Sequence, residues 1–121
     1  KDGQRKLIIY SMGNFISNQR IETMEGVPTA QWTERGVLMD VTIEKKDGVT
    51  SIQTAQARPT WVNRVSNGRY AENGQPLYTY QTYILEDFIE GGQHRDLLDE
   101  ATKARIDTAY QEMTNLMNLK W

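Results

Sequence analysis

The sequence predicts an α+β fold in which antiparallel strands, joined by a β-hairpin, are closed by a C-terminal helix. Residues 36–58 carry a two-residue alternation of side chains and the dipeptide Asp47-Gly48, which together are typical of a hairpin with a tight turn. Residues 96–118 instead place apolar side chains at three- and four-residue steps, as an amphipathic helix does. The chain of 121 residues is the size of one domain and, without cysteine, has no disulfides.

The N-terminal part is predicted to form a strand followed by a long loop. Residues 7–11 begin with an unbroken apolar run, which is typical of a strand that is buried on both faces. Residues 17–32 are mostly polar and contain Gly26 and Pro28, so they are expected to form a loop. A loop of this length favours a functional or partner-covered role.

The central part is predicted to contain the hairpin and one further strand. The first hairpin strand has one face formed by Val37, Met39, Val41 and Ile43. Pro59 is expected to end the return strand, and two Asn-Gly pairs within 63–77 predict a loop. An aromatic and β-branched run predicts another strand at 78–85.

The predicted helix carries one stripe of side chains that we expect to pack on the strands. The stripe is defined by steps of three and four residues. Its members are Leu98, Ala101, Arg105, Ala109, Met113, Leu116 and Met117.

Composition argues against several classes of function. Lys and Arg number 14 and Asp and Glu number 16, a net charge of −2, which argues against a nucleic-acid partner. The longest apolar run has four residues, so we expect no membrane contact by this segment. The single histidine, His94, cannot supply a two-metal centre, and a solvated residue is its simplest interpretation. We therefore expect no metal ion or other cofactor to be held by this chain alone.

Two short motifs supply the candidate functional residues. Ser11, Gly13 and Asn14 follow the predicted first strand, and in open α/β sheets this position faces the ligand crevice. Arg35 stands at the entrance of the next strand, and its planar guanidinium suits a carboxylate or a phosphate. A structural alternative stays open for each motif. Asn14 could cap its own backbone in a strand-exit turn, and Arg35 could form a strand-end salt bridge.

Three ordered blocks resemble the bacterial capsule synthesis CapA family, also called the poly-γ-glutamate biosynthesis (PgsA-type) family. The first block is residues 7–16, LIIYSMGNFI, together with Gln19. The second is residues 33–38, TERGVL, and the third is residues 59–62, PTWV. Met12 stands where the family more often has leucine. The helical last third of the chain fits the family's variable C-terminus less specifically.

This resemblance implies a calcineurin-like metallophosphoesterase fold, in which helices cover two packed sheets in four layers, α/β/β/α. Residues 1–121 would be its C-terminal part, and the Asp, Asn and His motifs that hold divalent metal ions would precede Lys1 in a longer parent protein. The family is tied to capsule or poly-γ-glutamate production, so the resemblance implies an anionic polymer or the capsule machinery as partner. It also implies an extracytoplasmic location, at the cell surface or anchored to the membrane through the parent's N-terminal region.

Three interpretations of function stay open on the sequence. The parent is a metal-dependent hydrolase of this superfamily and the present chain is its C-terminal portion, with cleft-proximal residues at Ser11, Gly13, Asn14 and Arg35. The same fold serves instead as a non-catalytic scaffold or polymer-binding module. Without the resemblance, the chain is a standalone α+β interaction domain.

The isolated chain is expected to self-associate. The apolar run of residues 7–10 needs cover on both faces, and some of its neighbours would come from upstream residues of the parent. Edge pairing, or exchange of residues 7–16 between two copies, would supply that cover. The alternative is that this segment frays while residues 36–62 and the last helix form a small monomeric core.

Overall fold

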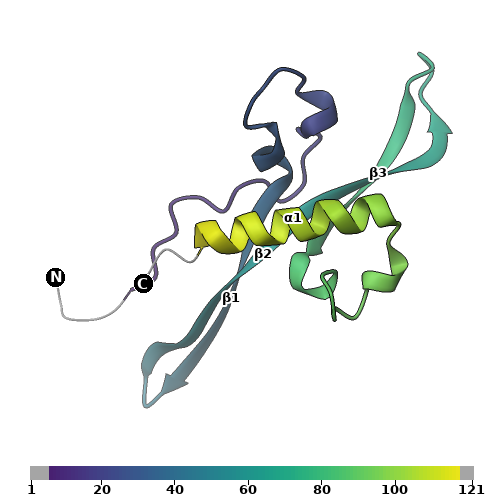
Figure 1. The fold of residues 1–121 in the computed structure, drawn as a ribbon. Helices are drawn as coiled ribbons and strands as arrows, with labels where there is room; N and C mark the ends of the chain where they lie inside the picture. The colour runs from purple at the N-terminus through teal and green to yellow at the C-terminus, as the bar shows by residue number, and fades with distance from the viewer. Residues whose placement is uncertain (1–5, 118–121) are drawn as a thin grey trace.

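The computed structural model describes residues 6–117 and shows an antiparallel three-stranded sheet crossed by one long helix (Figure 1). The strands β1 (Arg35–Lys46), β2 (Val49–Tyr70) and β3 (Pro76–Ile84) lie in the order β1-β2-β3. The helix α1 (Glu100–Met117) packs on the middle of the sheet. The predicted α+β fold with antiparallel strands and a C-terminal helix is confirmed.

The predicted hairpin is present and joins β1 to β2. Asp47 and Gly48 form its turn with φ angles of 51° and 78°, the left-handed conformation that a tight turn requires. Thr42 pairs with Thr54 but Ile43 pairs with Ile52, so β2 contains a bulge. The half of the hairpin next to the turn extends beyond α1 as a two-stranded arm (Figure 1).

The strand β2 does not end at Pro59, and the loop predicted for residues 63–77 is wrong for its first half. Pro59 lies opposite Val37, whose N–H points away from β2 and donates to the Met12 carbonyl. In an antiparallel ladder the nitrogen of Pro59 therefore points away from β1 as well. Pairing with β3 starts only at Thr60, so this proline removes no ladder hydrogen bond and β2 continues to Tyr70.

The strand predicted at residues 7–11 is not formed. The chain that follows residues 7–11 meets the edge of β1 through an isolated bridge between Gly13 and Gly36. Gly13 has a φ of 72°, which turns the chain away from the edge of β1. The side chains of Ile8 and Tyr10 are 66% and 97% exposed, and they belong to the surface through which self-association is expected.

The predicted loop at residues 17–32 contains two short 3-10 helices, η1 (Ile21–Thr23) and η2 (Ala30–Glu34), the second reaching β1. Two more, η3 (Leu85–Asp87) and η4 (Arg95–Leu97), connect β3 to α1. The strand predicted at 78–85 corresponds to β3, with Leu85 already in η3.

The helix α1 starts later than the predicted helix of residues 96–118, whose last residue lies outside the described part of the chain. Asp99 precedes the first turn and its carboxylate accepts a hydrogen bond of 2.7 Å from the Thr102 N–H. This bond lowers the pKa of Asp99 and defines the start of the helix. None of the helices within residues 6–117 is long and apolar enough to cross a membrane.

The core lies between α1 and the sheet, and the predicted stripe is only partly correct. Ala109 and Met113 are buried as predicted, whereas Leu116 is exposed. Ile106, which the stripe left out, has no exposed surface. The face of the helix that packs on the sheet is therefore rotated slightly about the helix axis relative to the predicted stripe. The buried core cluster consists of Trp61, Leu85, Phe88, Ile106, Ala109 and Met113.

Candidate functional site

The three sequence blocks meet at one junction near the start of β1. Gly13 of the first block is bridged to Gly36 of the second, and Gly36 pairs with Thr60 of the third. The Asn14 side-chain amide donates a 2.7 Å hydrogen bond to the Thr33 carbonyl. Residues far apart in the sequence are thus held side by side.

The candidate residues of the first block have structural contacts at this junction. A Cβ on Gly13 would lie 2.8 Å from the Arg35 carbonyl oxygen, so only glycine allows this approach. The Ser11 hydroxyl accepts a hydrogen bond from the Gly13 N–H at 3.4 Å. Asn14 joins two chain segments rather than capping its own backbone. The structure therefore brings Ser11, Gly13, Asn14 and Arg35 together.

Arg35 is buried, with 6% of its surface exposed, and faces α1. Its Nη1 forms an ion pair with Glu112 of α1, and its guanidinium lies 4.8 Å from the centre of the Trp32 ring. Its Nε is buried without a hydrogen-bond partner. The predicted strand-end salt bridge is present, but it leaves one donor of the guanidinium unused.

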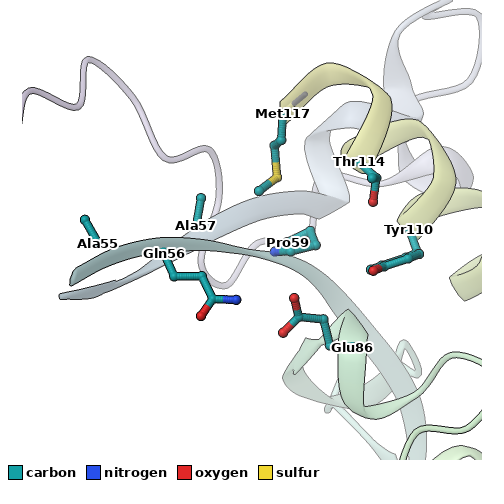
Figure 2. A pocket seen from close by; sticks show the side chains of 8 residues that line it. All are labelled: Ala55, Gln56, Ala57, Pro59, Glu86, Tyr110, Thr114 and Met117. Carbon is teal, nitrogen blue, oxygen red and sulfur yellow. The ribbon is translucent and has the colours of Figure 1, made fainter. Parts of the chain in front are cut away.

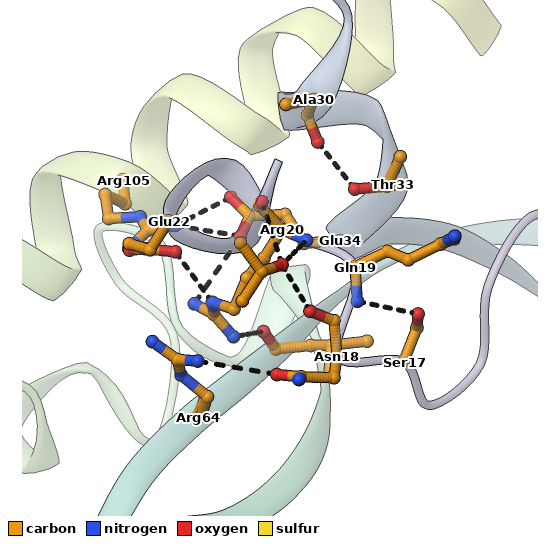
Figure 3. Close-up of polar contacts among 12 residues, drawn as sticks. Ser17, Asn18, Gln19, Arg20, Glu22, Ala30, Thr33, Glu34, Arg64 and Arg105 are labelled. Atoms are coloured by element: carbon orange, nitrogen blue, oxygen red, sulfur yellow. Dashed lines mark hydrogen bonds and ion pairs between the residues drawn. The ribbon is translucent and has the colours of Figure 1, made fainter. Parts of the chain in front are cut away.

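A second charged cluster contains Glu34, the residue before Arg35, and was missed by the sequence analysis; Figure 3 shows its side chains. Arg105 of α1 donates two hydrogen bonds of 2.8 Å to the Glu34 carboxylate, which is 2% exposed. Arg20 lies 3.5 Å from the same carboxylate and binds Glu22 at 2.8 Å. Both guanidinium groups lie over Trp61: Cζ of Arg20 is 5.9 Å and Cζ of Arg105 is 5.3 Å from the centre of its ring.

This cluster connects the 17–34 segment to the helix and the sheet. Arg20 donates a hydrogen bond of 3.3 Å to the Val62 carbonyl, and Arg105 binds Glu22 at 2.5 Å. Burial acts to lower the pKa of Arg105, but the hydrogen bonds to Glu34 and Glu22 outweigh it and raise that pKa. The signal in the sequence was an arginine inside an apolar helical stripe, which indicates a buried ion pair.

Two adjoining cavities lie between α1 and the 17–34 segment, with Arg35 on the wall of both. Their volumes are about 230 Å³ and 520 Å³, and they share Ile21, Arg35 and Thr108. The smaller cavity reaches the Glu34–Arg105 pair, and the larger one reaches Glu112. In this groove, which we call the Arg35 groove, a buried charge and open volume coincide.

Another cavity, of about 310 Å³, lies between β2 and the end of α1 (Figure 2). Its lining includes Ala57, Pro59 and Met117 together with the Glu86 carboxylate. Glu86 already accepts a hydrogen bond of 2.8 Å from Arg58, which also binds Asp40 at 3.2 Å. Among residues 6–117, the one ionic side chain in the lining of this cavity is therefore already paired, with an arginine outside the lining.

His94 is exposed and precedes η4, with its ring 5.5 Å from that of Phe88. Within residues 6–117, His, Cys, Asp and Glu side chains do not gather in groups of three or more that could hold a metal ion. The metal ions that the family resemblance implies for the parent stay a prediction.

Comparison with known proteins found no match to this chain among protein-family models, curated proteins or solved structures. The junction and the Arg35 groove therefore have to be interpreted from their own chemistry.

Glu22 is expected to make stability depend on pH in the acid range. Partial burial acts to raise its pKa, but hydrogen bonds from Arg20, its own backbone N–H and Arg105 lower it from 4.5 to about 2. The stabilisation is complete above pH 4.5 and is lost as the pH falls towards 2. Because the carboxylate is partly exposed, we expect a contribution of about 1 kcal/mol.

The measurement is the free energy of urea unfolding of the wild type and of Glu22→Gln between pH 6 and pH 2. The wild type should be the more stable protein at pH 6, and the difference should vanish near pH 2. Glu25→Gln, a change of the same charge in the same segment, is the control for the loss of one negative charge. A difference between wild type and Glu22→Gln that is constant with pH would contradict the assignment.

Proposed function

We propose that this chain is the C-terminal portion of a CapA-like protein that acts in the synthesis, export or anchoring of an anionic polymer at the bacterial cell surface. The observation that carries the proposal is the junction. Three blocks that resemble the family at separate places in the sequence, 7–16, 33–38 and 59–62, are in mutual contact through Gly36. Unrelated similarities would have no reason to converge on one place in the fold.

Within such a parent, the chain would supply structure and binding surface and the upstream part would supply the metal ligands. This division is supported by the contacts of Asn14 and Gly13, which hold neighbouring segments together. The scaffold interpretation, in which the parent has no catalysis, is favoured by the same observation. Asp and His metal motifs in the upstream coding sequence would distinguish an enzyme from a scaffold.

The proposal is tested by deleting the complete gene in its host and measuring the polymer at the cell surface. We expect surface polymer to be lost and to return on complementation with the wild-type gene. Complementation with Asn14→Ala should restore less polymer, because the hydrogen bond to the Thr33 carbonyl is gone. The matched control is Asn67→Ala, in the exposed end of β2 before the β2–β3 turn, which should complement fully.

Protein level and folding of each variant are measured in parallel. Loss of polymer with a normal protein level would support a role of the junction in the function. Unchanged surface polymer after deletion of the gene would contradict the proposal as a whole.

A further inference from the structure

Arg35 is a buried cation whose pairing is incomplete. Among the side-chain nitrogen and oxygen atoms of residues 6–117, its Nε is buried without a hydrogen-bond partner. The ring of Trp32 covers the guanidinium at 4.8 Å, and Nη1 binds Glu112. A guanidinium can donate five hydrogen bonds, and its Nε and Nη2 edge is one of the two edges that can bind a carboxylate in a fork.

The carboxylate that now neutralises Arg35 is easily exchanged. The side chain of Arg35 is 5% exposed, whereas that of Glu112 is 41% exposed. Glu112 can therefore return to water at little cost in free energy, whereas a buried Arg35 without any anion would carry a large desolvation penalty. A buried arginine paired with an exposed glutamate is the arrangement expected where a protein carboxylate occupies the position of a ligand's carboxylate.

The Arg35 groove extends from this pair along the 17–34 segment. The cavity of about 520 Å³ has an apolar wall formed by Ile21, Met24 and Val27. Ile21 and Val27 are 48% and 40% exposed, so this wall is open to a ligand. Glu25 also lines the cavity, and a second negative charge on the ligand near it would be repelled.

The other charged groups of the groove do not compete for an anion or repel it strongly. Glu34 is held by Arg105 in two hydrogen bonds of 2.8 Å, and Arg20 lies 3.5 Å from it. Its charge is therefore neutralised within the cluster. Arg35, which lines both cavities, is left as the guanidinium with an unused donor.

We propose that the Arg35 groove binds an aliphatic monocarboxylate, whose carboxylate takes the place of Glu112 on Arg35 and whose hydrocarbon body lies against Ile21, Met24 and Val27. This inference rests on the geometry of the groove and does not depend on the proposed membership of the CapA-like family. Glu112 acts as the internal occupant that sets the affinity, since it must leave before the ligand binds.

Hexanoate is the probe, titrated at neutral pH into the ¹⁵N-labelled chain while the Arg35 Nε–H signal is followed by NMR. We expect a saturable shift of that signal in the wild type. In Glu112→Gln the internal carboxylate is removed with the size retained, and hexanoate should bind about tenfold more tightly, a difference of about 1.4 kcal/mol. Hexanol and hexylamine, which have the same chain without a carboxylate, should give no shift.

Val27→Ser tests the apolar wall without touching Arg35. This substitution should weaken the binding of hexanoate several-fold and leave the binding of acetate unaffected, because acetate lacks the hydrocarbon body. Val65→Ser, on the exposed part of β2, is the matched control and should change neither the affinity for hexanoate nor that for acetate. Circular dichroism checks that each variant is folded.

The proposal is overturned if hexanoate leaves the Arg35 Nε–H signal of folded Glu112→Gln unchanged. It is also overturned if acetate and hexanoate bind equally well and Val27→Ser has no effect, since both ligands would then be responding to charge alone. Tighter binding to Glu112→Gln together with weaker binding to Val27→Ser is the result that supports it.

Discussion

Replacing Glu34 by alanine is expected to lower the free energy of unfolding by about 3 kcal/mol, because it breaks a buried ion-pair cluster. Glu34 is 2% exposed and accepts two hydrogen bonds from Nη2 of Arg105, one on each carboxylate oxygen, with Arg20 3.5 Å away. Its removal leaves the two guanidinium groups beside Trp61 with Glu22 as their remaining carboxylate. The measurement is urea unfolding followed by tryptophan fluorescence.

A double-mutant cycle separates the loss of the pair from the loss of packing. Glu34→Leu with Arg105→Leu removes both charges, and the double variant should be more stable than Glu34→Leu alone. Glu44→Ala, on the exposed arm of the hairpin, is the matched surface control and should cost less than 0.5 kcal/mol. A loss below about 1 kcal/mol in Glu34→Ala would show that the cluster does not hold the 17–34 segment in place.

Replacing Gly36 by alanine is expected to open the junction between the three blocks. A Cβ at this position would lie 2.6 Å from the Asn14 carbonyl oxygen and 3.0 Å from that of Met12, closer than van der Waals contact allows. Either the 7–16 segment detaches or β1 shifts, and we expect a loss of about 2 kcal/mol. The decisive measurement is hydrogen exchange of the Val37 amide, which donates to the Met12 carbonyl at 2.7 Å.

This amide should exchange faster in Gly36→Ala, while the amides of α1 keep their protection. Gly13→Ala approaches the same contact from the other side, 2.8 Å from the Arg35 carbonyl oxygen, and should have the same effect. Thr54→Ala, on an exposed part of β2, serves as the control. Unchanged exchange at Val37 in both glycine variants would mean that the segment is not packed against β1 as described.

Features that depend on neighbours in the sequence were predicted well. The hairpin followed from Asp47 and Gly48, because the left-handed conformation of the turn is a property of those two residues. The helix followed from its three- and four-residue period. For the candidate site, the close approach of Gly13 to Arg35 and Gly36 was not predicted from the sequence, and the role of these residues in function stays a proposal.

Features that depend on distant partners were predicted poorly. The apolar run at residues 7–10 indicated a strand, but a strand needs a neighbour, and Gly13 turns the chain away from β1. Pro59 indicated the end of β2, yet its nitrogen faces no strand and the ladder continues. Neither outcome can be read from the local pattern, since hydrogen-bond partners in a sheet come from other segments.

Local conformational preference, turn chemistry and side-chain period are carried by short stretches of chain, so the sequence by itself determined the hairpin, the helix and the α+β class. The contacts of Arg35 were decided only in three dimensions. Its guanidinium meets Trp32, which is close in sequence, but its carboxylate partner Glu112 is 77 residues away. The same holds for Arg105 and Glu34, 71 residues apart, because the charge of a buried arginine is stabilised by whichever carboxylate the packing of α1 brings to it.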